Sequence, residues 1–216
     1  PAIFGTMLGV SLADMSRLTD DPDDRTPYLD VAERTAAQLD HAFGFDPFER
    51  IQGVLGPMAG LAKVTTPREG GRPYPAANLR WMEPGGLGLP AHVGNEFELQ
   101  TERASAHLRS VSRIADHCSW FVVLQPPTEG GALRIYDATS DSPIPGMNDW
   151  GTHGRIDQNF DSISGRCIDP EAGTLVLFGG GWRWHRIDPV RGSRPRVTYG
   201  GFAGPSHDGS EFHLWF

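Results

Sequence analysis

From about residue 79 onward, short apolar runs alternate with glycine and proline, and this pattern predicts a β-rich fold. The apolar runs cover 120–124, 132–136, 174–178, 196–202 and 211–216. Many short strands punctuated by Gly and Pro are typical of a β-sandwich or a barrel. We therefore predict a mainly β fold with flanking helices, most simply a double-stranded β-helix, also called a jelly roll.

The N-terminal part has a different pattern, and its clearest element is a helix predicted over residues 31–43. Apolar side chains recur there at roughly helical spacing. Gly44 stands where a glycine commonly ends a helix. Asp30 and Glu33 have the spacing of a capping box, which predicts that the helix begins after Asp30.

The length of 216 residues suits one domain with a well-buried core. We expect residues 1–78 to form a helical and loop part that packs on the outside of a barrel formed by 79–216. Residues 66–75 are rich in Pro, Gly and Arg and predict a loop, whereas 105–116 are a candidate second helix. No repeat, low-complexity tract or linker divides the sequence, so we predict a single domain over 1–216.

The composition argues against several classes of function. A net charge of −8 disfavours nucleic acid as the main partner, because DNA- and RNA-binding surfaces are usually basic. No apolar run approaches the length that spans a membrane, and no signal-peptide pattern is present, so the expected location is cytoplasmic. Cys118 and Cys167 are too few for a disulfide framework or a CxxC metal site; we expect two buried free thiols, with a single disulfide as the alternative.

The histidines include candidate ligands for a metal. Non-haem iron is commonly held by two histidines and one carboxylate. In the usual sequence pattern the carboxylate stands two residues after the first histidine, but none of the eight histidines has Asp or Glu there. His92 has Gly94 at that position, and His185 follows a strand-like run and three glycines. The pair would supply two nitrogen ligands and leave the place of the carboxylate open.

The predicted strand that follows His185 carries a candidate binding site for a carboxylate. Arg196 and Thr198 share one face of this strand, because side chains alternate with a period of two. A guanidinium fork beside a hydroxyl suits a carboxylate, which it can hold by two charge-assisted bonds. Arg191 is a rival for the same role, and a surface position is the alternative for Arg196 in this arginine-rich protein.

Several blocks in order carry a resemblance that is more specific than any one motif. The blocks are 91–97, 129–133 with Tyr136, 185–192 and 196–202. Over 79–216 the chain resembles the iron(II)/2-oxoglutarate-dependent oxygenase superfamily. Within that superfamily it is similar to the aliphatic halogenases that chlorinate free-standing indole alkaloids of the hapalindole and welwitindolinone type.

The resemblance implies a role for each residue of the candidate site. His92 and His185 would bind iron(II), which 2-oxoglutarate would chelate through its keto oxygen and one carboxylate. The far carboxylate would lie on Arg196, assisted by Thr198, and the missing side chain of Gly94 would leave room for chloride. Dioxygen would convert 2-oxoglutarate to succinate and yield a chloro-iron(IV)-oxo species. That species would abstract hydrogen from an unactivated carbon, and the carbon radical would take the chlorine.

The same resemblance implies a small-molecule substrate that is free-standing, not tethered to a carrier protein, and fairly apolar. Aromatic side chains near the blocks are candidates for its pocket: Trp81, Trp120, Trp182, Trp184 and Phe202. Core packing is the competing interpretation for most of them. Asn95 and Glu96 are candidates for hydrogen bonds that orient the metal ligands.

Three other functions fit the same residues. A hydroxylase of the same superfamily would hold water at the position of Gly94. In a cupin-like iron enzyme, Glu96 would be the carboxylate ligand, which requires a sharp bend of the chain after His92. The third alternative is a jelly-roll module that has lost its metal and only binds a ligand, since one fold hosts many functions.

Overall fold

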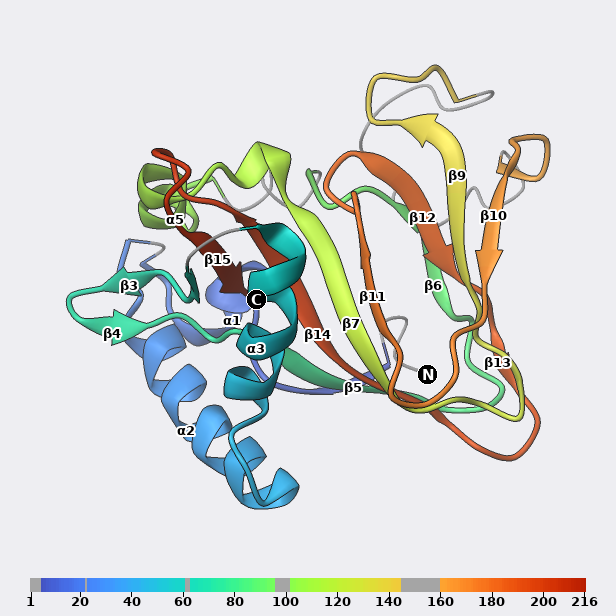
Figure 1. Cartoon of the computed structure of the whole chain (residues 1–216), viewed down its shortest axis with the longest axis horizontal. Helices are drawn as coiled ribbons and strands as arrows, with labels where there is room; N and C mark the ends of the chain where they lie inside the picture. Colours follow the sequence, from blue (N-terminus) through green and yellow to red (C-terminus); the bar gives the residue numbers. More distant parts are fainter. Residues whose placement is uncertain (1–4, 22, 61–62, 96–101, 145–159) are drawn as a thin grey trace.

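Two β-sheets form the centre of the computed structural model, which describes residues 5–21, 23–60, 63–95, 102–144 and 160–216 (Figure 1). The seven-stranded sheet contains β1 (Thr6–Leu8), β2 (Val64–Thr65), β5 (Asn78–Met82), β7 (Cys118–Gln125), β11 (Leu175–Phe178), β14 (Arg196–Pro205) and β15 (Phe212–Trp215). The four-stranded sheet contains β6 (Leu89–His92), β9 (Leu133–Thr139), β10 (Gly165–Ile168) and β12 (Arg183–Ile187). The described chain is thus mainly β with flanking helices, and the jelly-roll class predicted from the sequence is confirmed.

Shorter elements complete the described structure. Two small ladders pair β3 (Arg68–Glu69) with β4 (Arg72–Pro73) and β8 (Glu129–Gly130) with β13 (Val190–Arg191). The helical segments are η1 (Leu12–Asp14), α1 (Met15–Leu18), α2 (Thr26–Phe43), α3 (Pro47–Ala59), α5 (Ala106–Val111) and η2 (Ile114–Asp116). None of the helices in the described ranges is long and apolar enough to cross a membrane. The two cysteines are free thiols, as predicted, but the prediction that both are buried was wrong, since Cys118 is only partly buried and Cys167 is exposed.

The long strand β14 organises the larger sheet. It pairs antiparallel with β5 at one end, with β15 at the other, and with β7 along its opposite edge. Because side chains alternate along a strand, its two faces differ. Val197 and Tyr199 pack into the core cluster that includes Leu39 of α2 and Leu55 of α3. Arg196 and its neighbours of the same parity therefore face away from the helices.

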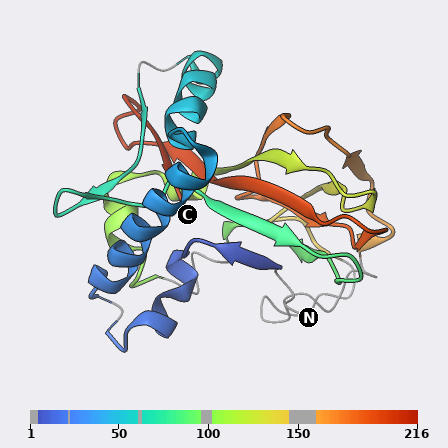
Figure 2. The ribbon, with the colours of Figure 1, turned by 90° about the horizontal axis from the view of Figure 1, so that it is seen from below.

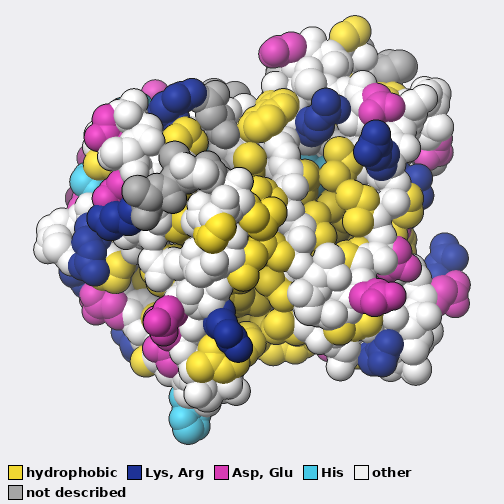
Figure 3. All heavy atoms as spheres, in the orientation of Figure 1, with side chains coloured by type: hydrophobic (Ala, Val, Ile, Leu, Met, Phe, Trp, Pro, Cys, Tyr) yellow, Lys and Arg dark blue, Asp and Glu magenta, His cyan; other side chains and the backbone are white. Residues whose placement is uncertain are grey.

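The helices cover one side of the larger sheet, and the smaller sheet lies on the other. Figures 1 and 2 both place α2 and α3 at one end of the molecule and β9, β10 and β12 at the other, with β5 and β14 between them. On the face drawn in Figure 3, hydrophobic side chains form a band between these two ends. Leu124 of β7 and Leu177 of β11 are among the large hydrophobic residues that stay exposed.

The helix predicted over 31–43 exists, but its start was predicted wrongly. α2 begins at Thr26, so Asp30 lies inside the helix and does not cap it. Pro27 is tolerated in the first turn, where its missing N–H has no helical partner to lose. The predicted C-terminal stop is confirmed, since Gly44 adopts the left-handed conformation with φ 73°.

Three other segments differ from the sequence prediction. α3 was not predicted, although Asp46 caps it by accepting hydrogen bonds from two backbone N–H groups. The loop predicted over 66–75 is a short hairpin of β3 and β4, because Gly70 and Gly71 supply the left-handed turn. The candidate helix over 105–116 is split into α5 and the 3₁₀ turn η2.

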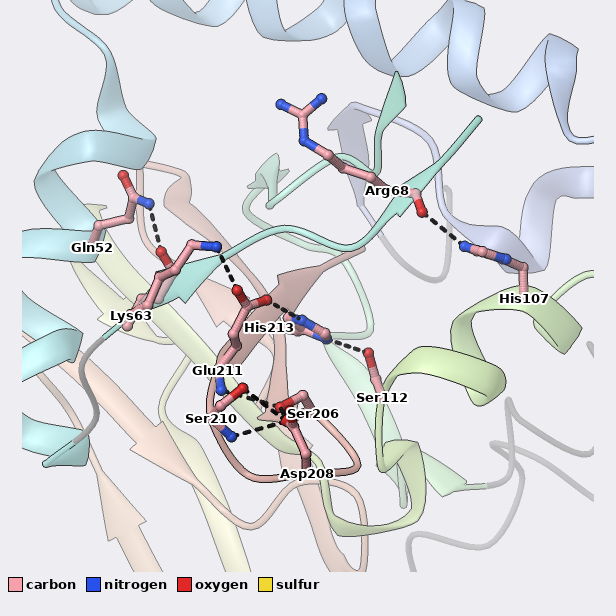
Figure 4. Close-up of polar contacts among 11 residues, drawn as sticks. Gln52, Lys63, Arg68, His107, Ser112, Ser206, Asp208, Ser210, Glu211 and His213 are labelled. Carbon is pink, nitrogen blue, oxygen red and sulfur yellow. Dashed lines mark hydrogen bonds and ion pairs between the residues drawn. The ribbon is translucent and has the colours of Figure 1, made fainter. Parts of the chain in front are cut away.

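A polar network, buried at Ser112 and His213 and exposed at Lys63, connects the end of α5 to β15 and to the segment before β2 (Figure 4). Ser112 Oγ lies 2.6 Å from Nδ1 of His213, and Nε2 of His213 lies 3.1 Å from Glu211, which also pairs with Lys63. The order Ser–His–Glu resembles the triad of a hydrolase. Ser112 is only 1% exposed, however, and does not line the cavity described below, so we assign the network a structural role.

Candidate functional site

A cavity of about 560 Å³ lies between the two sheets. Its wall takes residues from both sheets, from the segment that follows β1, and from the C-terminal end of the chain. Most of its large side chains are apolar: Met7, Leu12, Leu89, Leu108, Ile114, Trp120, Phe121, Leu133, Phe178, Ile187, Phe202, Trp215 and Phe216. Three histidines and two strand arginines also reach the cavity and form the candidate site.

His92 and His185 face this cavity together. His92 ends β6 and His185 lies in β12, where the two residues are direct antiparallel partners with ring centroids 4.2 Å apart. Nδ1 of His92 donates to the carbonyl of Pro90 at 2.8 Å, and Nδ1 of His185 donates to that of Arg183 at 2.9 Å. These bonds assign the tautomer in which Nε2 carries the lone pair that can bind a metal.

The environment keeps His185 in the neutral form that metal ligation needs. Burial lowers the pKa of His185 well below its usual value, and the neighbouring His92 lowers it further. Neutral imidazole is the form in which histidine binds metals. Two imidazoles oriented in this way fit a divalent transition metal such as iron.

Gly94 follows β6 and is held through its backbone. Its N–H donates to the carbonyl of Gly180 at 2.8 Å, and the N–H of Asn95 donates to that of Gly181 at 2.8 Å. The glycine run after β11 therefore fixes the loop that follows His92. Within the described ranges, no three His, Cys, Asp or Glu side chains are grouped to hold a metal. In that part of the chain the histidine pair thus has no third protein ligand.

His117 is a site residue that sequence reasoning missed. A Cβ atom on Gly94 would lie 2.8 Å from Cε1 of His117 and closer still to its Nε2. Nδ1 of His117 donates to the carbonyl of Ile114 at 2.6 Å, and burial lowers the pKa of His117 to about 4. The ring packs edge-on against Phe202 at 5.1 Å. No local motif marks this histidine, since only the fold brings η2 next to Gly94.

Arg196 and Thr198 lie where the alternation of β14 predicts, on the cavity face. Arg196 is only 4% exposed, and its guanidinium lies over the ring of Phe121 at 4.9 Å from the centroid. Nη1 of Arg196 is 3.5 Å from Oγ1 of Thr198, and Nη2 has no hydrogen-bond partner among the described residues. Burial lowers the pKa of Arg196 to about 10, which leaves it charged at neutral pH.

The rival arginine of the sequence analysis lies elsewhere. The side chain of Arg191, on β13, is 69% exposed, and its nearest acidic partner is Glu129 at 3.8 Å. It is not part of the cavity wall. A second arginine that the sequence analysis did not select, Arg80 on β5, does line the cavity.

The candidate aromatic residues divide into two groups. Trp120 and Phe202 line the cavity, whereas Trp81, Trp182 and Trp184 do not. Trp81 belongs to the core cluster on the helix side of the sheet, because it has the opposite parity to Arg80 on the same strand. Trp184 packs with Phe160 at 5.0 Å, and Trp182 lies against Gly179. Of the two candidate orienting residues, Asn95 has a buried Oδ1 without a described partner, and Glu96 lies outside the described residues.

The arrangement as a whole can bind a metal and an acidic ligand side by side. Two imidazoles could supply metal ligands, and two buried guanidiniums would attract anions. The apolar wall around them can hold a small organic molecule and exclude water.

Comparison with known proteins places the chain in a family. The family model described as "Carrier-protein-independent halogenase WelO5" matches residues 4–216. No curated protein matches the chain in sequence.

Among solved structures, an N-substituted L-amino acid dioxygenase from Burkholderia ambifaria AMMD is similar, with a TM-score of 0.65 and 17% identity over 99% of this chain and 78% of that one. The same kind of dioxygenase in complex with alpha-KG gives a TM-score of 0.61 and 16% identity over 96% and 77%. At such identities, these likenesses support the fold.

Proposed function

The chain belongs to the WelO5 family of carrier-protein-independent halogenases, within the iron(II)/2-oxoglutarate-dependent oxygenases, and on that premise we propose that it chlorinates an unactivated aliphatic carbon of a free-standing small molecule. The observation that carries this proposal is the pair His92–His185, which faces the cavity with Gly94 where a carboxylate ligand commonly stands. We call the coordination site that a carboxylate at residue 94 would fill the open position.

The fit of the residues to iron and 2-oxoglutarate rests on their chemistry. His92 and His185 would hold iron(II) through Nε2, and Arg196 with Thr198 would hold a carboxylate of 2-oxoglutarate. Iron bound there would supply the oxidation of an aliphatic C–H bond by dioxygen. In the overall reaction, R–H, 2-oxoglutarate, O₂, chloride and a proton give R–Cl, succinate, CO₂ and water.

Electrostatics favour an anion in the open position. Arg80 and Arg196 bring two positive charges to the cavity, and iron(II) would add two more. One carboxylate among the described lining residues, that of Asp14, already pairs with Arg17 at 2.9 Å. A dianionic co-substrate leaves positive charge that a halide can neutralise.

The wall of the cavity favours an apolar substrate. The chain's own contribution is to hold the substrate carbon near the open position, since the metal supplies the hard chemistry. Phe178, Phe202 and Trp215 present aromatic surface to the cavity, and Leu12 lines it from the N-terminal segment. Such a wall would bind a compact hydrophobic molecule by burial of apolar area.

Hydroxylation is the second candidate function, and His117 is the observation that favours it. In the tautomer that donates from Nδ1 to Ile114, Nε2 is a hydrogen-bond acceptor directed toward Gly94. Such a group suits water in the open position better than it suits chloride. The two solved structures with similar folds are described as dioxygenases, which is compatible with this alternative.

The first test measures the conversion of 2-oxoglutarate in the absence of a second substrate. The protein reconstituted with iron(II) should convert 2-oxoglutarate slowly to succinate, and His92→Ala or His185→Ala should abolish this conversion. His41→Ala, an exposed histidine on α2, is the matched control that should retain it. With candidate apolar substrates, a product with the chlorine isotope pattern supports halogenation, whereas a gain of one oxygen supports hydroxylation. Unchanged succinate formation in both cavity variants would contradict the proposed metal site.

A further inference from the structure

Arg80 is a second buried cation beside Arg196, and its role is not explained by the site described so far. Nε of Arg80 and Nη2 of Arg196 are both buried without a hydrogen-bond partner, and neither arginine pairs with a carboxylate in the described ranges. Among the described residues, Nη2 of Arg80 donates to the sulfur of Met7 at 3.5 Å, and a thioether is a weak acceptor. A buried charge without a partner is costly, so each guanidinium indicates a missing anion.

The register of the sheet places Thr198 next to both arginines, across the strands from Arg80 and two residues along β14 from Arg196. On β5 and β14, Arg80 is the direct partner of Thr198, and Met82 is the partner of Arg196. Side chains at such paired positions lie on the same face of the sheet, and diagonal neighbours stay within reach of long side chains. Arg80, Thr198 and Arg196 all line the same cavity.

The register of β14 orders the two cations along the cavity. Phe202, on the same face of β14 as Thr198, packs against His117, which lies beside Gly94. Because Arg80 is the partner of Thr198, it lies two residues nearer to Phe202 along β14 than Arg196 does. Arg80 is therefore the guanidinium on the side of the histidine pair, and Arg196 is the one farther from it.

Resting on the proposed function, we propose that Arg80 is a second anchor of 2-oxoglutarate and binds the carboxylate next to the keto group, while Arg196 and Thr198 bind the far carboxylate. Two guanidinium cations are complementary to the two carboxylate anions of a dicarboxylate. The oxygen of the near carboxylate that does not chelate iron can accept from Arg80. Each end of the co-substrate then has its own cation, and the cavity recognises the dicarboxylate before the metal is bound.

Two analogues of 2-oxoglutarate separate its two ends. 2-Oxovalerate keeps the carboxylate next to the keto group and has a methyl group in place of the far one. Levulinate keeps the far carboxylate and has a methyl group in place of the near one. Their binding, and that of 2-oxoglutarate, is to be titrated by calorimetry or ligand-observed NMR on the full chain, both metal-free and loaded anaerobically with iron(II).

Arg80→Met should weaken 2-oxoglutarate and 2-oxovalerate by about 10- to 100-fold, which corresponds to the loss of one charge-assisted contact, and leave levulinate unchanged. Arg196→Met should weaken the binding of 2-oxoglutarate and levulinate and leave the binding of 2-oxovalerate unchanged. Arg80→Lys, which keeps the charge, should recover part of the affinity. Arg191→Met is the matched control, since Arg191 is exposed and outside the cavity, and it should bind all three ligands normally.

A cooperative thermal transition would show that Arg80→Met is folded, and the unfolding temperature is a readout independent of the ligand titrations. Without ligand, Arg80→Met should unfold at a higher temperature than the parent protein, because it removes the repulsion between two buried cations. Its stabilisation by 2-oxoglutarate should be smaller. A lower unfolding temperature without ligand would mean that Arg80 already has a partner in the protein, and would overturn the proposal.

The outcomes separate this inference from the proposed function. If Arg80→Met weakens levulinate and spares 2-oxovalerate, or spares all three ligands while the parent protein binds 2-oxoglutarate on iron, only the role of Arg80 is wrong. If the parent protein fails to bind 2-oxoglutarate with or without iron(II), the proposed function falls, and the role of Arg80 falls with it.

Discussion

A Cβ atom on Gly94 would collide with the imidazole of His117, which is held by its bond to the carbonyl of Ile114. Glycine at this position is therefore required by packing as well as by the proposed open position. The two reasons are connected, because the ring of His117 lies in space that a carboxylate side chain at residue 94 would need. Substitution of Gly94 alone cannot distinguish the loss of a halide site from this collision.

The collision itself predicts an interaction between the two positions. Gly94→Asp should destabilise the protein by about 1–3 kcal/mol, as overpacking of a buried site usually does. Combining it with His117→Ala should cost less than the sum of the two single changes, because the smaller side chain makes room. Chemical denaturation of the parent protein, the two single variants and the double variant measures this interaction. Strictly additive costs would show that residues 94 and 117 do not compete for space.

The buried histidines predict that the metal-free protein loses stability in mild acid. Burial lowers the pKa of His117 from 6.5 to about 4, and it lowers that of His185 as well. The unfolded chain therefore binds more protons than the folded one between pH 6.5 and 4. The stability should be full above pH 6.5 and should fall through this window, by up to roughly 3 kcal/mol for His117. In His117→Phe the fall should be smaller, and an unchanged slope of stability against pH would contradict this assignment.

The network in Figure 4 predicts a change in stability without a change in the site. Ser112→Ala leaves a nitrogen of His213 buried without a partner, which should cost about 1–3 kcal/mol. Ser110→Ala is the matched control, because the hydroxyl of Ser110 is exposed, and it should cost less than about 0.5 kcal/mol. Both variants should bind 2-oxoglutarate like the parent protein. Weaker binding by Ser112→Ala alone would mean that the network also shapes the cavity.

Two glycines of the helical part predict changes of opposite sign. Gly44 has φ 73° after α2, so Gly44→Ala should destabilise the protein by about 1 kcal/mol, although a Cβ there meets no other atom. Gly53 lies inside α3 with open space beside it, so Gly53→Ala should stabilise by about 0.5–1 kcal/mol. Thermal unfolding of both variants tests the pair, and shifts in the same direction would contradict it.

The sequence predicts elements well where local physics decides them. The run 174–178 and the run that begins at Arg196 are strands because β-branched and apolar residues stand between glycine and proline breaks. The same reasoning missed α3, in which two glycines and Pro57 weaken the helical signal. It also misplaced the start of α2, because the capping-box spacing of Asp30 and Glu33 occurs inside the helix.

The candidate site was only partly predictable for a related reason. His92, His185 and Arg196 stand in motifs, and the strand period alone sets the shared face of Arg196 and Thr198. His117 and Arg80 reach the cavity through long-range pairing, and nothing in their local sequence reveals that pairing. For Arg80 a weak signal existed in the alternation of Asn78, Arg80 and Met82 with the apolar Leu79 and Trp81 along β5.

An anaerobic titration with chloride tests the central claim most directly. The metal-free protein is loaded with iron(II) and 2-oxoglutarate, and the weak metal-to-ligand charge-transfer band in the visible range is followed as chloride is added. The account predicts that the band forms, that chloride shifts it saturably, and that the shift persists in His117→Ala but is lost in Gly94→Asp with His117→Ala. A band that chloride leaves unchanged would contradict halogenation and favour hydroxylation, and no band at all would contradict the assignment of 2-oxoglutarate.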